Sequence, residues 1–333
     1  MIDIHNFARY NNQIIGQGGP SNSDFASFWG ALAGKYADEE RIMFGLMNEP
    51  HHLDINDWAD TCQEAVNAIR KAGATSQMIL LPGTNFDSAA TLLETGSVDT
   101  LMDIRNPDGS VDGLVLDVHK YLDEDNSGTH EECVTDNVDS FRELAEHLRD
   151  IGRLAMVSET GASRSSSVGL LEKSNRRGSL LTSYQCLEKF CAQNEFINEN
   201  SDVFLGIVGW AAGSFSNGYL MSLTPEMQNG RYVDNQLMKE CVVAPWVSSK
   251  ETLPPVRPNG SSSGASRTSP TSSTSSDSTG PSKGSATNGG RGGNGGGSNN
   301  DANDDSQGGM GSVMSSPALL ALFISASVAT IFL

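Results

Sequence analysis

The chain has 333 residues and a formal net charge of −19, which argues against nucleic-acid binding because that function needs a basic footprint. The length allows one large domain or two small ones. The hydrophobic fraction of 37% is low for a compact enzyme, because it averages globular sequence in residues 1–250 with a polar C-terminal part.

Within residues 1–250, short apolar runs alternate with amphipathic segments of helical period. The runs predict six strands, at residues 1–4, 41–47, 78–83, 114–121, 153–161 and 203–213. The amphipathic segments predict helices at 25–37, 55–74, 85–105, 134–152 and 180–200, the third being the weakest. Most strand candidates are apolar on successive residues, which is typical of parallel strands buried on both faces. An α/β fold follows, either a doubly wound open sheet or a closed (β/α)8 barrel.

Polar and aromatic side chains stand where nearly every predicted strand ends. They are His5, Asn48 with Glu49, His119 with Tyr121, Glu159, and Trp210. In a (β/α)8 barrel the C-terminal edge of the strands holds the active site. No Gly-rich phosphate fingerprint follows the first strand, so the nucleotide-binding open sheet is disfavoured.

Glu49 and Glu159 each follow an apolar strand, which separates them from ordinary surface carboxylates. Glycoside hydrolysis needs two carboxyl groups, one to protonate the leaving oxygen and one to attack the sugar or activate water. Pro50 ends strand pairing directly after Glu49 and helps to fix its loop. The pair therefore points to a glycosidase.

With these residues in place, residues 1–245 resemble the fungal endoglucanases of glycoside hydrolase family 5. The stretches that carry the resemblance are DIHNFARYNNQIIGQGGP, FGLMNEPH, NPDG, DVHKYLDEDNSGTHEEC, SETG and NSDVFLGIVGWAAGSF. The resemblance implies a retaining endo-β-1,4-glucanase on a (β/α)8 barrel that cleaves cellulose or a related β-glucan. It further implies Glu49 as acid/base and Glu159 as nucleophile, with carboxyl groups about 5–5.5 Å apart.

The resemblance also implies a set of residues that contact or orient the substrate: His5, Asn48, Phe86, His119, Tyr121 and Trp210. Asn48 would hold the sugar 2-hydroxyl, and Trp210 would present a flat face to a glucose ring. Phe86 stands where relatives often carry Trp, so its platform would be weaker. Trp58 is open between a sugar platform and core packing, because it lies on the apolar face of a predicted helix.

The chain departs from the family pattern in two places. Only strands three to eight of the barrel are recognisable, so the chain is expected to be N-terminally truncated and to lack the arginine that the family places after strand two. Residues 162–185 are longer than the family has there, either as an extra loop or as a translated intron.

For the five cysteines, the resemblance implies the disulfides Cys133–Cys186 and Cys191–Cys241, with Cys62 free and buried. Because no Cys/His cluster has zinc spacing, neither a metal nor another cofactor is expected.

The C-terminal part is predicted to attach the protein to a membrane. Residues 251–316 are expected to be a disordered Ser/Gly/Thr-rich stalk with a glycan acceptor sequon at Asn259. Residues 317–333 form an apolar tail after a polar spacer, which is typical of a glycosyl-phosphatidylinositol (GPI) attachment signal. Ser306 and Gly308 are candidate lipid sites, and a tail-anchor helix is the alternative.

The whole chain is thus expected to be an extracellular, surface-anchored monomer whose partner is a β-glucan. Two alternatives remain open: a β-mannanase or other β-glycanase of the same family, and a non-catalytic glucan-binding surface protein.

Overall fold

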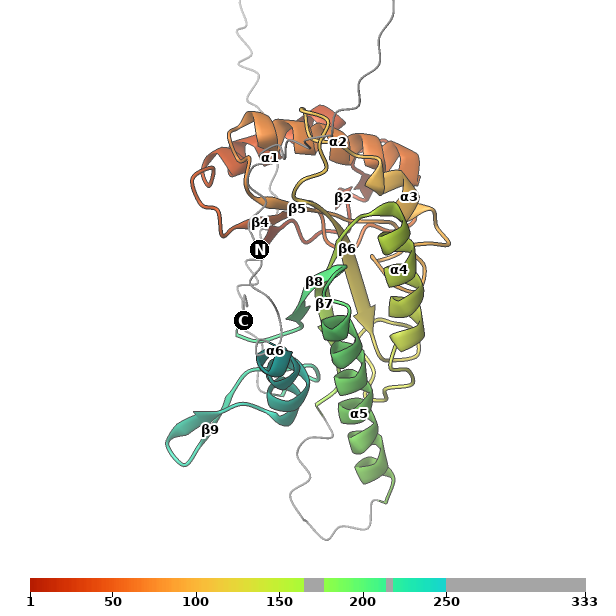
Figure 1. The fold of residues 1–333 in the computed structure, drawn as a ribbon, viewed down its shortest axis with the longest axis vertical. Coiled ribbons are helices and arrows are strands. Elements are labelled where there is room, and N and C mark those ends of the chain that lie inside the picture. Colours follow the sequence, from red (N-terminus) through yellow and green to blue (C-terminus); the bar gives the residue numbers. More distant parts are fainter. Residues whose placement is uncertain (165–176, 214–217, 250–333) are drawn as a thin grey trace, which may run out of the picture. The chain divides into compact units, whose positions relative to one another are not determined.

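The computed structural model describes residues 1–164, 177–213 and 218–249. Its centre is a parallel sheet of six strands in the order β1-β4-β5-β6-β7-β8 (Figure 1). The strands are β1 (Ile2–Asp3), β4 (Met43–Gly45), β5 (Met78–Leu81), β6 (Leu114–Tyr121), β7 (Ala155–Gly161) and β8 (Phe204–Gly209). All six strands predicted from the sequence are confirmed, and each pairs in parallel with its neighbour in chain order.

Alternate residues of the strands face two different environments. Phe44, Ile79 and Leu116 belong to a large core that includes side chains of the helices. Their neighbours on the opposite face, such as Met43, Leu80 and Val115, form a small separate cluster inside the curl of the sheet. This division is the one a (β/α)8 barrel makes between its helix-covered outside and its interior.

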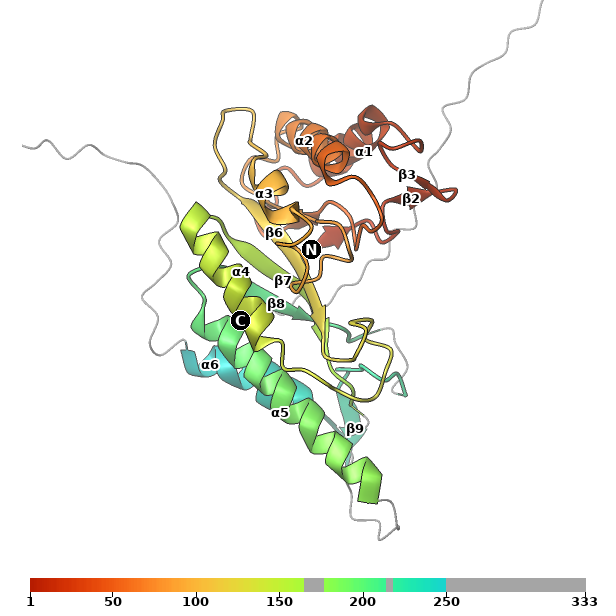
Figure 2. The same cartoon turned by 90° about the vertical axis from the view of Figure 1, so that its right-hand side faces the viewer.

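Five helices follow the first five strands of the sheet, four of them as predicted and the third only in part. They are α1 (Asn22–Gly34), α2 (Ile55–Lys71), α3 (Ser97–Met102), α4 (Val138–Ile151) and α5 (Arg177–Glu199), and Figure 2 shows them from the side. Ser21 caps α1 in a capping box with Asp24, and Asp54 caps α2 by accepting two backbone N–H groups.

The prediction of a helix over 85–105 is wrong for most of its length, because only α3 is helical there. Asn85, Phe86 and Asp87 instead have left-handed backbones, with φ of 60°, 63° and 54°. A right-handed helix cannot contain three such residues. This loop proves important for the site described below.

The sequence patterns also missed several short elements. They are the hairpins β2 (Arg9–Tyr10) with β3 (Gln13–Ile14) and β9 (Glu226–Gln228) with β10 (Arg231–Val233), the π-helix η1 (Leu237–Val243) and α6 (Ala244–Ser249). Strands of two or three residues are too short to show a period in the sequence.

Trp58 is a core residue, which settles the choice that the sequence left open. Its side chain is 0% exposed, and its Nε1 donates a hydrogen bond to the Pro82 carbonyl oxygen at 2.9 Å. It therefore offers no face to a sugar.

Both disulfides implied by the resemblance are present, Cys133–Cys186 and Cys191–Cys241. The first disulfide joins the loop after β6 to α5, and the second joins α5 to η1, around a second apolar cluster. Cys62 is free and buried in the main core, as expected.

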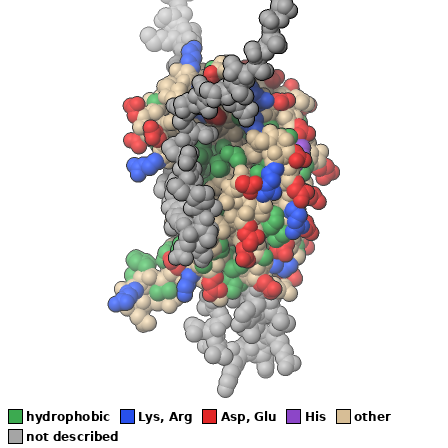
Figure 3. Space-filling model, viewed as in Figure 1, with side chains coloured by type: hydrophobic (Ala, Val, Ile, Leu, Met, Phe, Trp, Pro, Cys, Tyr) green, Lys and Arg blue, Asp and Glu red, His purple; other side chains and the backbone are tan. Residues whose placement is uncertain are grey.

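The predicted stalk, glycan site, lipid sites and apolar tail lie outside the described residues, as do residues 165–176 of the extra segment. Within the described part, no helix combines the length and the apolar character that a membrane crossing requires. Figure 3 shows Asp and Glu side chains spread over the visible face, as the net charge of −19 leads one to expect.

Candidate active site

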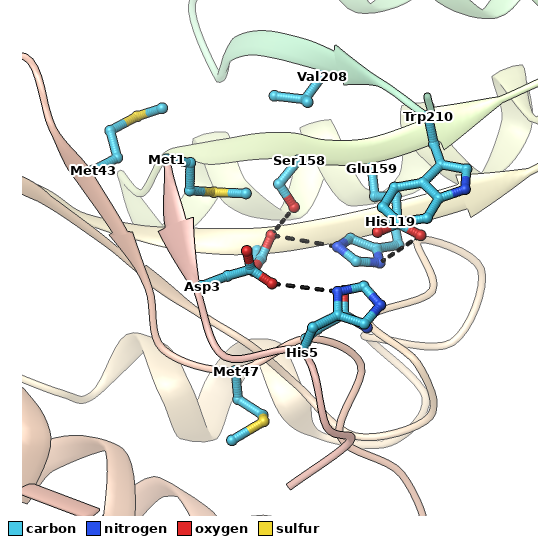
Figure 4. A pocket seen from close by; sticks show the side chains of 12 residues that line it. Met1, Asp3, His5, Met43, Met47, His119, Ser158, Glu159, Val208 and Trp210 are labelled. Carbon is cyan, nitrogen blue, oxygen red and sulfur yellow. Dashed lines mark hydrogen bonds and ion pairs between the residues drawn. The ribbon is translucent and has the colours of Figure 1, made fainter. Parts of the chain in front are cut away.

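The strand-end residues singled out in the sequence meet at one edge of the sheet. A pocket at the carboxyl ends of the strands is lined in part by His5, Asn48, His119, Glu159 and Trp210. Figure 4 shows His5, His119, Glu159 and Trp210 gathered on one side of it, while Met1, Met43 and Val208 line the other side.

Glu49 and Glu159 both approach the same nitrogen of the His119 ring. The His119 Nδ1 atom is 3.0 Å from Glu49 Oε1 and 4.0 Å from Glu159 Oε1. One oxygen of each carboxylate and the ring nitrogen lie within 4.8 Å of one another. His119 and Glu159 are direct neighbours across β6 and β7, after an irregularity in register at Val118. The two carboxylates expected to act together are thus within a sugar ring's width of each other.

Tyr121 holds the Glu159 carboxylate from the side. Its phenolic O–H donates a hydrogen bond to Glu159 Oε1 at 2.8 Å. Burial and the charge of Glu159 raise the pKa of Tyr121 well above its usual value, so the phenol stays protonated and remains a donor. Tyr121 therefore favours the ionised form of the carboxylate that it contacts.

Burial raises the pKa of Glu159, and the charge of Glu49 adds to this effect. The positive charge of His119, the Tyr121 hydrogen bond and the charge of His5 oppose the increase. Among the described residues, these two histidines are the cations that favour ionised Glu159. The expectation that the chain lacks the arginine that the family places after strand two stays a prediction.

His119 is fully buried among acidic groups. Burial by itself lowers the pKa of His119, but Glu159, Glu49, Asp117 and Asp87 outweigh it and raise that pKa well above the usual value. On the ring's other side, Nε2 lies 3.9 Å from Asp117 Oδ1. Burial raises the pKa of Asp117 to about 6, against the opposing effect of His119. The ring is thus held between acidic partners at both nitrogens.

Glu49 leaves β4 with an unusual backbone, at φ 49°. The preceding residue, Asn48, is 5% exposed and donates its N–H to the Ile4 carbonyl oxygen. The Asn48 Nδ2 atom has no hydrogen-bond partner among the described residues, although it is buried. A buried amide donor beside Glu159 in the pocket lining is poised for a hydroxyl group.

His5 and Trp210 form a stacked pair at the rim. Their ring centroids are 5.6 Å apart at an interplanar angle of 18°. His5 Nδ1 lies 3.3 Å from Asp3 Oδ2, and the Trp210 Nε1 donates to the Tyr219 hydroxyl at 2.9 Å. Burial lowers the pKa of His5, but the Asp3 contact and the charge of Glu159 reverse this and raise it. The Trp210 indole is thus held in place by the His5 ring and by the Tyr219 hydroxyl.

Phe86 lies in the loop after β5 and stacks on His51. It is not part of the stacked pair of His5 and Trp210. The ring centroids of Phe86 and His51 are 4.4 Å apart at 19°. Phe86 is half-buried, so part of the ring remains open to solvent.

Sequence reasoning missed Asp3, Asp87 and Asp117, which lie beneath the predicted residues. Asp117 has a usable signal, because it precedes His119 by two positions on the same strand and so faces the same side. Asp87 has none, since it lies in a loop that the sequence patterns assign to a helix.

Three groups of His and acidic side chains in the described residues have the geometry that a cation could use. They are Glu49 with His119 and Glu159, Asp87 with Asp117 and His119, and Asp123 with Asp125 and His130. Acidic groups often cluster in this way without an ion. The expectation of an enzyme without metal or cofactor therefore stays a prediction.

A curled parallel sheet with helices outside and two carboxylates at its C-terminal edge is the arrangement found in barrel-type glycoside hydrolases. Residues 1–216 match the family described as Cellulase (glycosyl hydrolase family 5). The chain belongs to this family.

The relatives are endoglucanases. Endoglucanase EG-II of Hypocrea jecorina is 47% identical over 243 residues, which are 73% of this chain and 54% of that protein. The chain thus spans about half the length of this curated relative. The crystal structure of Cel5A (EG2) from Hypocrea jecorina (Trichoderma reesei) has a TM-score of 0.65 at 48% identity, over 72% of this chain and 68% of that one. XacCel5A, solved in complex with cellopentaose, has a TM-score of 0.60 at 27% identity, over 72% and 71%.

Proposed function

We propose that the protein is a retaining endo-β-1,4-glucanase that cleaves cellulose or a related β-glucan. The observation that carries this proposal is the approach of Glu49 and Glu159, whose oxygens lie within 4.8 Å of each other and of His119. Retaining glycosidases hold their carboxyl groups about 5–5.5 Å apart, whereas inverting ones need about 6.5–9.5 Å to admit a water molecule. The endoglucanase names of the relatives and the cellopentaose bound to XacCel5A support a β-1,4-glucan as substrate.

In the first step, Glu49 gives its proton to the glycosidic oxygen while a Glu159 oxygen attacks the anomeric carbon. The bond to the leaving sugar breaks, and an ester between Glu159 and the retained sugar forms. In the second step, Glu49 takes a proton from water, whose oxygen displaces Glu159 from the anomeric carbon. Two displacements restore the original configuration, and both carboxyl groups return to their starting states.

The surrounding residues orient the two carboxylates and the sugar. Tyr121 keeps Glu159 ionised and fixes its oxygen through the 2.8 Å hydrogen bond. Asn48 offers its unpartnered Nδ2 to the 2-hydroxyl of the sugar that becomes esterified. Trp210 and Phe86 present ring faces to the apolar faces of glucose units.

The test replaces the nucleophile. Glu159→Gln keeps the shape of the side chain but removes the attacking charge, so hydrolysis of carboxymethyl cellulose should fall by roughly four to six orders of magnitude. The exposed Glu188→Gln serves as the matched control and should retain full activity. Undiminished hydrolysis by Glu159→Gln would assign the reaction to another residue.

The substrate is tested on the same preparation. The proposal expects carboxymethyl cellulose to be cleaved faster than mannan, with the β-anomer as the first product. A faster rate on mannan would make the protein a β-mannanase. Failure to cleave any of these glycans, despite binding them, would favour the non-catalytic alternative.

We also propose that residues 251–333 hold the enzyme at the outer cell surface through a GPI anchor. The polar spacer and apolar tail of the sequence support this, and the disulfides suit an oxidising compartment. A phosphatidylinositol-specific phospholipase should then release activity from intact cells into the medium. If activity stays with the cells after that treatment, the tail is embedded as a helix instead.

A further inference from the structure

The reaction described above leaves Asp87 without a role, although it is a fully buried carboxylate at the site. It lies in the loop that follows β5, and its side chain is 0% exposed. Its two oxygens accept hydrogen bonds from two separate strand ends. Oδ1 accepts the N–H of Gly83 at 2.5 Å, and Oδ2 accepts the N–H of Glu49 at 3.0 Å.

The backbone of the same loop is tied to β6 and to the segment after Glu49. The Asp87 carbonyl oxygen accepts the N–H of His119 at 2.8 Å, and the N–H of Ala89 donates to the His119 carbonyl oxygen at 3.0 Å. Phe86 donates its N–H to the Pro50 carbonyl oxygen at 3.0 Å. The loop thus links the chain segments that carry Glu49 and His119, two side chains that contact each other.

Glu49 needs such a restraint because its backbone is in the left-handed region, at φ 49°. For a residue other than glycine this conformation is strained and persists only where the surroundings impose it. The direction of the Glu49 side chain follows from this backbone. The Asp87 carboxylate holds the N–H of that very residue, from a position that water does not reach.

We propose that Asp87 is a positioning residue for the acid/base Glu49. By holding the Glu49 N–H, it fixes the left-handed turn that directs the Glu49 carboxyl group toward the glycosidic oxygen and toward His119. This inference rests on the proposed function, which assigns proton transfer to Glu49.

Substrates with different leaving groups distinguish a misplaced general acid from a general loss of active-site structure. A 2,4-dinitrophenyl leaving group departs without protonation, whereas phenol needs a proton from the general acid. The two aryl β-cellobiosides are therefore compared by kcat/KM, which reports the steps up to the glycosyl-enzyme. The measurements use the full chain rather than an isolated part of it.

For Asp87→Ala we expect kcat/KM on phenyl β-cellobioside to fall about 100-fold, the loss typical of a catalytic group displaced by about 1 Å. On 2,4-dinitrophenyl β-cellobioside the loss should be less than about threefold, because Glu49 is not needed as an acid there. If the Ala variant does not fold, Asp87→Asn takes its place. The amide keeps the volume and one acceptor, so a smaller loss with the same dependence on the leaving group is expected.

Asp123→Asn is the matched control. Asp123 is also a buried aspartate, 3% exposed, that accepts backbone N–H groups, those of Gly128, Thr129 and His130. Since it does not bond Glu49, its replacement should lower the two rates by the same factor. Equal losses on both substrates for Asp87→Ala or Asp87→Asn, or no loss on either, would overturn the role of Asp87. A wild-type protein that cleaves neither substrate would instead overturn the proposed function.

Discussion

At the scale of single residues, the site is a balance of buried charges around His119. Acidic side chains face this ring from several elements: Glu49 after β4, Asp87 after β5, Asp117 on β6 and Glu159 on β7. Each carboxylate raises the pKa of the ring, and a charged ring in turn lowers the pKa of Glu159. Because burial raises the pKa of Glu159, the proposed nucleophile, its ionisation in the working pH range depends on its few favourable contacts.

Tyr121→Phe tests that dependence. The Tyr121 O–H lowers the pKa of Glu159, so its removal lets that pKa rise further. Because attack requires the ionised carboxylate, the acid limb of the kcat/KM profile should move to higher pH. The loss of a hydrogen bond to a charged group corresponds to about one pH unit or more.

The measurement is kcat/KM against pH for both proteins. Tyr232→Phe is the control, because Tyr232 is 76% exposed on β10, so its replacement removes the same hydroxyl from a residue that water surrounds. Its profile should match the wild type. An unshifted acid limb in Tyr121→Phe would mean that the hydrogen bond from Tyr121 does not set the ionisation of Glu159.

At the scale of elements, the sheet could be predicted and the loops could not. Buried strands such as β6 and β7 begin with three successive apolar residues, and in a chain with alternating helices that pattern is typical of a parallel sheet. The loop at 85–89 is held by Asp87, which forms hydrogen bonds with Gly83, Glu49 and His119. Glu49 and His119 lie far from Asp87 in the sequence. A pattern of local spacing carries no information about such contacts, so a helix was the wrong expectation.

The same division applies to the site. The residues at strand ends were predictable, because parallel strands bring all their carboxyl ends to one edge. Trp58 could not be decided from the sequence, since a helix face that packs against a sheet and one that lines a cleft are both apolar. Asp3, Asp87 and Asp117 were missed because carboxylates shielded from water are rare, and contacts across the fold explain them. Asp3 lies beside His5 and Asp117 beside His119, while Asp87 accepts the N–H groups of Gly83 and Glu49.

At the scale of the whole molecule, the buried site and the acidic surface act on stability in the same direction. His119, Glu159, Asp87 and Asp117 all have raised pKa values, so at these four groups the folded protein binds more protons than the unfolded chain. Stability from such groups is fully present below their unfolded pKa values and is lost as the pH rises through the folded ones. The net charge of −19 at pH 7 adds self-repulsion that also weakens as the pH falls.

We therefore expect the melting temperature to increase as the pH is lowered from 8 toward about 5.

Asp117 contributes a defined part of this dependence of the melting temperature on pH. Its pKa rises from 3.8 to about 6 on folding, so its contribution, on the order of 3 kcal/mol, is lost between those values as the pH increases. Asp117→Asn cannot ionise, so this variant should show a flatter dependence of melting temperature on pH between 4 and 6. Asp202→Asn is the contrast, because its partner Arg149 lowers the pKa of Asp202 and its stabilising effect is lost only as the pH falls. Equal slopes for Asp117→Asn and the wild type would mean that Asp117 is ionised in the folded protein throughout this range.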